Sequence, residues 1–170
     1  MATNMDVSIR YSTFIPMLLE AMARTTGDVL ELGPGVFSTP LLHWLCERQK
    51  RNLVTIENNW KWHRFVKPYL KTDRHQFFFV RNWDDVEPYI NKEWDVALID
   101  HSPYSRRIVE IEKLSNLAKY LVVHDSEPWK DKESHYSQIY PLFKYRFNFD
   151  KADHQTAVLS NFYPVNDFWL

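Results

Sequence analysis

Residues 29–42 read VLELGPGVFSTPLL and decide the first part of the fold. An apolar run ends at Leu32, Gly33 and Gly35 follow it, and Ser38 precedes a second apolar stretch. This order predicts a strand, a tight turn and a helix that begins near Ser38. Glycine lets a backbone pass close to a ligand, and a helix N-terminus attracts anionic groups. The chain has only three glycines, so a turn that holds two of them is the first candidate for a binding site.

Beyond this turn, short apolar runs alternate with amphipathic stretches. Strands that alternate with helices and are apolar throughout, such as 96–99 and 120–123, are typical of a parallel sheet covered on both faces. The last two runs are joined by a polar turn at 150–154, which predicts an antiparallel hairpin at one edge. The expected fold is α/β, with a mostly parallel seven-stranded sheet and helices on both faces. We expect strands at 28–32, 53–57, 76–80, 95–100, 120–125, 145–149 and 156–162, and helices at 14–22 (capped by Ser12 or Thr13), 38–48, 60–70, 84–91, 105–118 and 134–143.

The composition indicates one domain with an ordinary hydrophobic core. Of the 170 residues, 45% are hydrophobic and 25% are charged, and the net charge is −1. This balance excludes extensive disorder and argues against nucleic acid or an anionic membrane as a partner. Cys46 is the only cysteine, which excludes a disulfide framework and suits a reducing compartment. Since we find no signal-peptide pattern and no long apolar run, we expect a cytoplasmic protein with one domain at 1–170, comprising an N-terminal helical segment at 1–26 and a core at 27–162.

In an open parallel sheet the ligand lies at the carboxyl ends of the strands, and these positions are polar here. Glu57 ends the second expected strand and follows Gly35 by 22 residues, close to the spacing of about 20 at which an acidic residue reaches ribose hydroxyls. Asn82 and Trp83 follow the third strand, where the indole is suited either to cover an adenine ring or to pack in the core. The spacing of Glu57 favours a nucleoside at this edge of the sheet.

Two aspartates end the fourth and fifth expected strands. Asp100 precedes His101, and His124 precedes Asp125. Because these strands are neighbours in the expected order, the two carboxylates can face one another across the mouth of the site. Each aspartate is equally suited to cap the helix that follows it, and each histidine to be a hydrogen-bonded structural residue.

The glycine count separates two classes of cofactor. A dinucleotide fingerprint requires a third glycine, where this chain has Ser38, and a second mononucleotide-binding half. S-adenosylmethionine has no pyrophosphate and needs one half only: a turn beside its methionine moiety, an acid for the ribose and a cover for the adenine. The sequence therefore favours the methyl donor.

Four runs carry a resemblance to a known family: VLELGPGVFSTPLL at 29–42, LVTIEN at 53–58, DVALIDHS at 95–102 and LVVHDSE at 121–127. In this order and spacing they resemble the class I, Rossmann-like S-adenosylmethionine-dependent methyltransferases over residues 27–162. The resemblance implies that fold, with its terminal hairpin, and methyl transfer from this donor. The resemblance assigns Glu31, Gly33, Gly35 and Glu57 to donor binding. Together with the strand ends, the expected donor-binding positions are Glu31, Gly33, Gly35, Ser38, Thr39, Glu57, Asn58, Asn82, Trp83 and Asp100.

The strand ends are most similar to the catechol O-methyltransferase-like, metal-dependent branch of that superfamily. This similarity implies an Mg²⁺-type ion held by Asp100 and Asp125, with Ser126 where the branch has asparagine. The branch's general-base lysine would fall at Pro103, so Asp100 and His101 are the expected catalytic residues, with His101 as the base if no metal binds.

Three functions stay open at this point. The first is O-methylation of a small hydroxylated acceptor, with or without a metal ion. The second is N-methylation of an amine, because Asp100–Tyr104 (DHSPY) loosely resembles the turn of amino-methylating enzymes. The third is a cofactor-binding interaction module without catalysis. The short segment before the first strand leaves little material for an acceptor pocket, so a homodimer is a further expectation.

Overall fold

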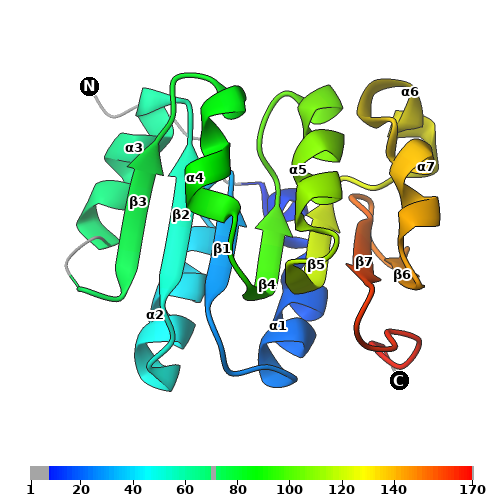
Figure 1. Cartoon of the computed structure of the whole chain (residues 1–170), viewed down its shortest axis with the longest axis horizontal. Coiled ribbons are helices and arrows are strands. Elements are labelled where there is room, and N and C mark those ends of the chain that lie inside the picture. The colour runs from blue at the N-terminus through cyan, green and yellow to red at the C-terminus, as the bar shows by residue number, and fades with distance from the viewer. Residues whose placement is uncertain (1–7, 70–71, 170) are drawn as a thin grey trace.

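The strands form a single sheet in the computed structural model, which describes residues 8–69 and 72–169. They are β1 (Val29–Leu32), β2 (Leu53–Glu57), β3 (His75–Phe79), β4 (Trp94–Ile99), β5 (Ala118–His124), β6 (Tyr145–Phe149) and β7 (Thr156–Ser160). Their order is β3-β2-β1-β4-β5-β7-β6 (Figure 1). The first five strands are parallel, whereas β7 is antiparallel to both β5 and β6. This seven-stranded sheet with its closing hairpin confirms the expected fold class.

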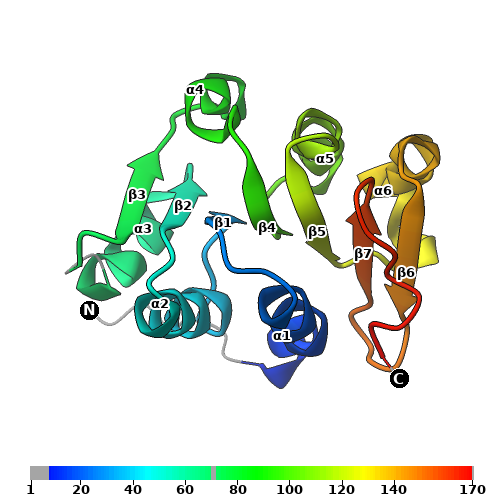
Figure 2. The same ribbon diagram turned by 60° about the horizontal axis from the view of Figure 1, so that its bottom comes forward.

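Helices cover both faces of the sheet (Figure 2). One face carries α1 (Ile15–Ala23), α2 (Ser38–Gln49) and α3 (Trp60–Val66), and the other carries α4 (Glu87–Ile90), α5 (Arg107–Leu114), α6 (Asp131–Ser134) and α7 (Tyr136–Ile139). No helix in the described part of the chain has both the length and the apolar character needed to cross a bilayer.

Two apolar cores lie on the two sides of the sheet. Along β4, Ala97 and Ile99 point to the side of α4, α5 and α7, whereas Val96 and Leu98 point to the side of α1 and α2. A parallel strand buried on both faces needs apolar residues at successive positions, which is why β4 reads as an unbroken apolar run. The C-terminal residues Val165 and Phe168 complete the second core.

The first, third and fourth helices differ from the expectation. The helix α1 begins without a side-chain cap, because its N-cap residue is Phe14. The Ser12 hydroxyl donates to the carbonyl of Ile9, and the Thr13 hydroxyl donates to the carbonyl of His154. The helix expected at 60–70 ends as α3 at Val66 and continues as a 3-10 turn at Lys67–Tyr69, and its last expected residue, 70, lies outside the described residues. The helix expected at 84–91 consists of a 3-10 turn followed by the single turn α4.

Candidate functional site

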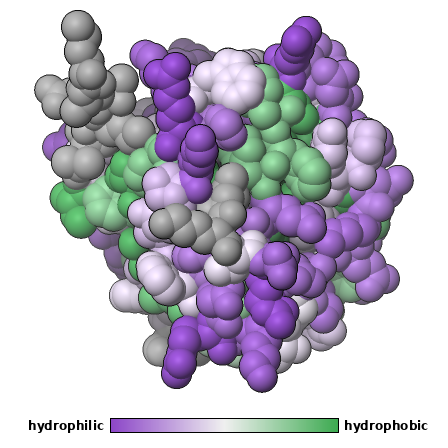
Figure 3. All heavy atoms as spheres, turned by 90° about the vertical axis from the view of Figure 1, so that its left-hand side faces the viewer, coloured by the Kyte–Doolittle hydropathy of each residue, from purple (hydrophilic) through white to green (hydrophobic). Residues whose placement is uncertain are grey.

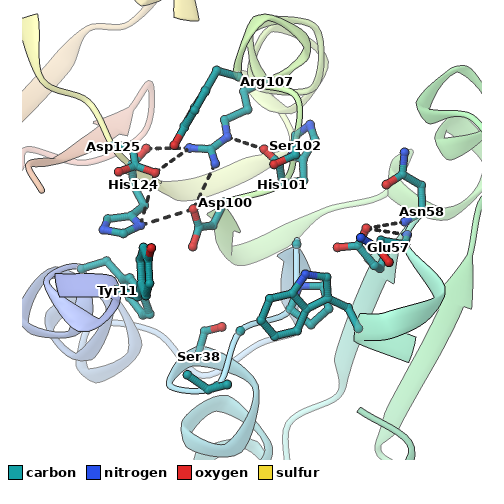
Figure 4. A pocket seen from close by; sticks show the side chains of 18 residues that line it. Tyr11, Ser38, Glu57, Asn58, Asp100, His101, Ser102, Arg107, His124 and Asp125 are labelled. Carbon is teal, nitrogen blue, oxygen red and sulfur yellow. Dashed lines mark hydrogen bonds and ion pairs between the residues drawn. The ribbon is translucent and has the colours of Figure 1, made fainter. Parts of the chain in front are cut away.

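A cavity of about 360 Å³ opens at the carboxyl ends of β1, β2, β4 and β5. Figure 4 shows side chains from these strand ends and from the N-terminal segment around it. This is the edge of the sheet at which we predicted a ligand from the sequence. The cavity is lined by Tyr11, Phe14, Gly33, Pro34, Gly35, Val36, Ser38, Glu57, Asn58, Asn59, Trp62, Asp100, His101, Ser102, Tyr104, Arg107, His124 and Asp125.

The turn after β1 requires glycine at position 33 for two reasons. Gly33 has a φ of +87°, a backbone conformation that side chains rarely adopt. A Cβ at Gly33 would also lie 2.5 Å from the backbone nitrogen of His101, so the β4 end leaves no room for it. At Gly35 a Cβ would lie 3.0 Å from Ser38 Oγ, which is tight but less severe. The glycines therefore serve the close approach of β1 and β4 as well as any ligand in the cavity.

Glu31 lies under this turn and does not line the cavity. Its carboxylate accepts hydrogen bonds from Thr39 Oγ1 at 2.9 Å and from Thr55 Oγ1 at 2.7 Å. Burial raises the pKa of Glu31 to about 7, against the effect of these hydroxyl donors. Thr55 also contacts His75 Nε2 at 2.9 Å, and His75 Nδ1 lies 3.2 Å from His43 Nδ1. Glu31 thus ends a buried hydrogen-bonded chain that runs to α2.

Glu57 presents one carboxylate oxygen to the cavity. Its Oε1 accepts from the backbone nitrogens of Asn58 at 2.7 Å and Asn59 at 2.8 Å, so the side chain is held in place by its own turn. Oε2 takes part in neither bond. Burial raises the pKa of Glu57 against the effect of the two backbone donors. A fixed carboxylate with one free oxygen is well suited to accept hydrogen bonds from a diol.

Two of the expected donor-binding residues, Asn82 and Trp83, do not line the cavity. Trp83 is 2% exposed, donates from Nε1 to the carbonyl of Ser102 at 2.8 Å and packs against the His101 ring. Asn82 caps the following 3-10 turn by accepting from the Asp84 backbone nitrogen. The tryptophan that lines the cavity is Trp62, which sequence reasoning missed because a helix position does not reveal which face it will occupy.

Asp100 keeps one carboxylate oxygen for the cavity. Its Oδ1 accepts from Arg107 Nη2 at 3.1 Å and lies 3.3 Å from His124 Nδ1 (Figure 4). Among the described residues, none forms a hydrogen bond with Oδ2 or places a charged nitrogen within 4.0 Å of it. Asp100 is therefore anchored through one oxygen and accessible through the other.

Arg107 connects the ends of β4 and β5. From α5 its guanidinium donates to the backbone carbonyls of His101 at 2.5 Å and His124 at 2.9 Å. It also contacts Asp100, and Nη1 lies 3.7 Å from Asp125 Oδ2. The side chain is buried, so its charge stabilises both carboxylates at short range with little screening. The sequence contained no signal for Arg107, because nothing in the α5 pattern shows that this arginine points inward.

His124 lies between the Thr13 hydroxyl and the carboxylate of Asp100. The Thr13 hydroxyl donates its proton to the His154 carbonyl at 2.7 Å, so Thr13 Oγ1 accepts from His124 Nε2 at 3.1 Å, while Nδ1 faces Asp100. Burial lowers the pKa of His124, but the charges of Asp100 and Asp125 outweigh it and raise the pKa overall. This environment favours the protonated ring, which donates to its neighbours and has no free nitrogen to act as a base.

The imidazole of His101, the expected base, is directed toward α5. Its Nε2 lies 3.1 Å from Glu110 Oε2, and its ring is on the α5 side of the strand end (Figure 4). Burial lowers the pKa of His101 although Glu110 opposes this effect. The backbone of His101 lines the site, and its imidazole connects β4 to α5.

The aspartates expected to hold a metal ion are paired with cationic side chains. Arg107 contacts Asp100 and Asp125, and Lys130 Nζ lies 2.8 Å from Asp125 Oδ1. His154 Nδ1 lies 2.6 Å from the same oxygen, so the group of His124, Asp125 and His154, with ligand atoms within 4.8 Å, is already internally bonded. Buried Ser126 Oγ has no hydrogen-bond partner in the described parts of the chain, yet it does not line the cavity. This donor set does not fit a divalent cation, because an ion would have to displace two fixed positive charges.

Solved structures with the same fold include several methyltransferases. The cofactor-bound Rv0187 from MTB superposes with a TM-score of 0.68 at 19% identity, over 95% of this chain and 84% of that one. The Methanococcus jannaschii fibrillarin pre-rRNA processing protein gives 0.64 at 13% identity, over 92% and 77%. The O-methyltransferase TomG from Streptomyces achromogenes, involved in tomaymycin synthesis and solved with SAM, gives 0.61 at 17% identity, over 88% and 79%. No family model and no curated protein sequence matches the chain. At these identities the similarity establishes the Rossmann-like methyltransferase fold.

Proposed function

We propose that this protein is an S-adenosylmethionine-dependent methyltransferase. The observation that carries the proposal is the fixed carboxylate of Glu57, with one oxygen free at the carboxyl end of β2, in the same cavity as the glycine turn after β1. Those two features are what a nucleoside with an amino-acid tail requires at this edge of the sheet. The fold comparison supports the same reading, because TomG was solved with this donor.

The donor would span the cavity from the glycine turn to Trp62. Its methionine moiety would lie along Gly33–Gly35 and Ser38, and its ribose at Glu57. Asn58 and Trp62 would contact the adenine, since both line the cavity next to Glu57. Glu31 and Thr39 would support the turn from below, while Trp83, positioned by the turn that Asn82 caps, would hold Ser102 in the wall.

On this reading, Asp100 accepts the proton from the methyl acceptor. Methyl transfer is an in-line displacement, so the protein must align the acceptor and donor and remove the acceptor's proton. The acceptor oxygen forms a bond to the methyl carbon as the sulfur–carbon bond breaks, and its proton passes to Asp100 Oδ2. Arg107 and His124 hold Oδ1 and keep the free oxygen directed at the cavity.

O-methylation of a small hydroxylated acceptor fits this arrangement better than N-methylation. In an amino-methylating turn the aromatic ring stacks on the target amine. Here the Tyr104 ring already faces the Arg107 guanidinium at 4.6 Å and the Lys130 ammonium at 5.2 Å. With these cations at the ring, it is poorly suited to bind another amine. The fixed cations at Asp100 and Asp125 further favour a reaction without a metal ion.

Calorimetry with S-adenosylmethionine and S-adenosylhomocysteine tests the donor site. We expect saturable binding of both, unchanged by a chelator, and a gain of about 2.7 kcal/mol in unfolding free energy at ligand concentrations 100 times Kd. Glu57→Gln should weaken binding roughly tenfold or more, whereas Glu112→Gln, at an exposed position of α5, should not. A lack of binding by the wild-type protein would contradict the proposal.

Transfer of a labelled methyl group to panels of hydroxylated compounds and amines tests the reaction. We expect incorporation into a hydroxyl acceptor, and a loss of about 10²-fold or more in kcat for Asp100→Asn with donor affinity retained. Donor binding without transfer to any member of either panel would instead support a binding module.

A further inference from the structure

Positive charge is concentrated in one part of this nearly neutral chain. Residues 48–81 contain nine lysines or arginines and two carboxylates, whereas the net charge of the whole chain is −1. These residues include β2, α3 and β3, which lie at one edge of the sheet (Figure 1). The average charge, which argued against nucleic acid, conceals this local excess.

Three of these cations form a stripe along α3 and its 3-10 extension. Lys61, Arg64 and Lys67 are exposed and recur every three residues, so they lie along one side of the helical segment. Within residues 8–69 and 72–169, no carboxylate lies within 4.0 Å of their charged nitrogens. Arg51, by contrast, is buried and bonded to backbone carbonyls, including that of Gly27. The stripe is therefore available to an anionic partner.

An exposed tryptophan stands at the beginning of the same stripe. Trp60 is 56% exposed and stacks on Phe79 of β3, with ring centroids 3.9 Å apart and an interplanar angle of 17°. Phe79 thus supports the indole from one side. A supported, exposed indole is a stacking platform of the kind that single-stranded nucleic-acid sites use.

The apolar side of α3 packs against the sheet. Val66 is buried, and His63 packs against Phe77 of β3 with ring centroids 4.9 Å apart. An interfacial membrane helix needs a free apolar face to insert, and α3 does not have one. On the face in Figure 3, hydrophilic side chains predominate and hydrophobic ones are confined to separate areas between them. The exposed cations and the exposed indole therefore suit a polyanion that carries aromatic bases better than a lipid surface.

We propose that Trp60, Lys61, Arg64 and Lys67, here called the α3 surface, bind single-stranded nucleic acid. The three cations contact successive phosphates, and a base stacks on Trp60. Asn59 and Trp62 belong to the same segment and line the donor cavity, so the strand would pass its rim. This binding does not depend on methyl transfer.

Fluorescence anisotropy with a labelled RNA of about a dozen mixed-sequence nucleotides tests the proposal. We expect binding by the wild-type protein with a slope of log K against log salt of about −2, as for three phosphate contacts on a single strand. K61Q/R64Q/K67Q should abolish most of that slope and weaken binding at least tenfold. K132Q/K144Q/K151Q removes the same charge from exposed positions elsewhere and should change affinity less than threefold. Trp60→Leu should weaken binding about fivefold or more, with the salt slope unchanged.

Three results would overturn the proposal. They are no binding at low salt, equal weakening by the two triple variants, and equal affinity of Trp60→Leu and wild type. Inorganic polyphosphate, a blunt duplex of the same sequence and phosphatidylserine vesicles serve as competitors. If any of them displaces the labelled strand more effectively than unlabelled single strand does, the surface recognises charge, duplex or lipid instead. Circular dichroism and thermal unfolding confirm that each variant is folded before binding is compared.

Discussion

Replacing Arg107 with methionine should destabilise the protein by about 3–5 kcal/mol. Methionine keeps most of the buried volume but leaves Asp100 and Asp125 without their shared cation, and removing one partner of a buried ion pair costs roughly this amount. The carbonyls of His101 and His124 also lose their donors at 2.5 and 2.9 Å, at about 1 kcal/mol each. These contributions overlap, because all of them arise from the same guanidinium.

Urea unfolding and thermal scans measure this loss. A change of 3–5 kcal/mol in a chain of this size lowers Tm by about 10 °C or more. Arg107→Lys should lose less, because it retains the charge without the planar fork. Arg106→Met is a poor control because Arg106 pairs with Glu110. Arg48→Met, at an exposed position of α2, should stay within about 0.5 kcal/mol of wild type.

Adding a divalent cation tests whether the Arg107 variant is destabilised by the lost positive charge or by the lost packing. If Arg107 and Lys130 stand where an ion would otherwise balance the aspartates, saturating Mg²⁺ should raise the Tm of R107M/K130M and leave that of the wild type unchanged. The reasoning about this cluster is refuted if R107M unfolds like the wild type, or if Mg²⁺ stabilises the wild type as much as the double variant.

Three further predictions concern the turn and the cavity wall. Gly33→Ala should cost several kcal/mol, because φ is +87° and the Cβ would meet the β4 backbone, whereas Gly35→Ala should cost clearly less; urea unfolding compares them. The pKa of Glu31 is about 7 in the folded protein, above its ordinary value near 4.5, so the folded state holds this proton longer than the unfolded one. Wild-type stability relative to Glu31→Gln should therefore fall as pH rises from about 5 to 7, and a flat difference across that window would contradict the assignment. Trp62→Leu should weaken donor affinity, measured by calorimetry, with little effect on Tm. Trp83→Leu should mainly lower Tm, measured by thermal scans.

The order of strands and helices could be predicted from sequence because parallel strands buried on both faces leave unbroken apolar runs. The strand ends also followed, since the first polar residue after such a run marks the edge where ligands bind. Glu57 and Asp100 line the cavity for this reason.

Side-chain direction beyond the strand ends could not be predicted. Trp62 and Trp83 are equally aromatic, and only the packing of their helical turns decides which one lines the cavity. The arrangement around Asp100 and Asp125 depends on Arg107 and Lys130, which lie on later segments and reach back toward the sheet. Whole-chain charge, likewise, averaged the basic α3 region with acidic segments elsewhere.

The hydrogen-bonded chain beneath the glycine turn has a direction. With Glu31 ionised, Thr55 donates to it, His75 donates from Nε2 to Thr55, and His43 donates from Nδ1 to His75. When Glu31 takes up a proton and donates it to Thr55, each hydroxyl and ring can turn its donor the other way, which moves the His43 proton to Nε2. The tautomers of His43 and His75 should therefore change with the ionisation of Glu31, whose carboxylate is fully buried. The ring-nitrogen chemical shifts of these two histidines would then report the charge beneath the glycine turn.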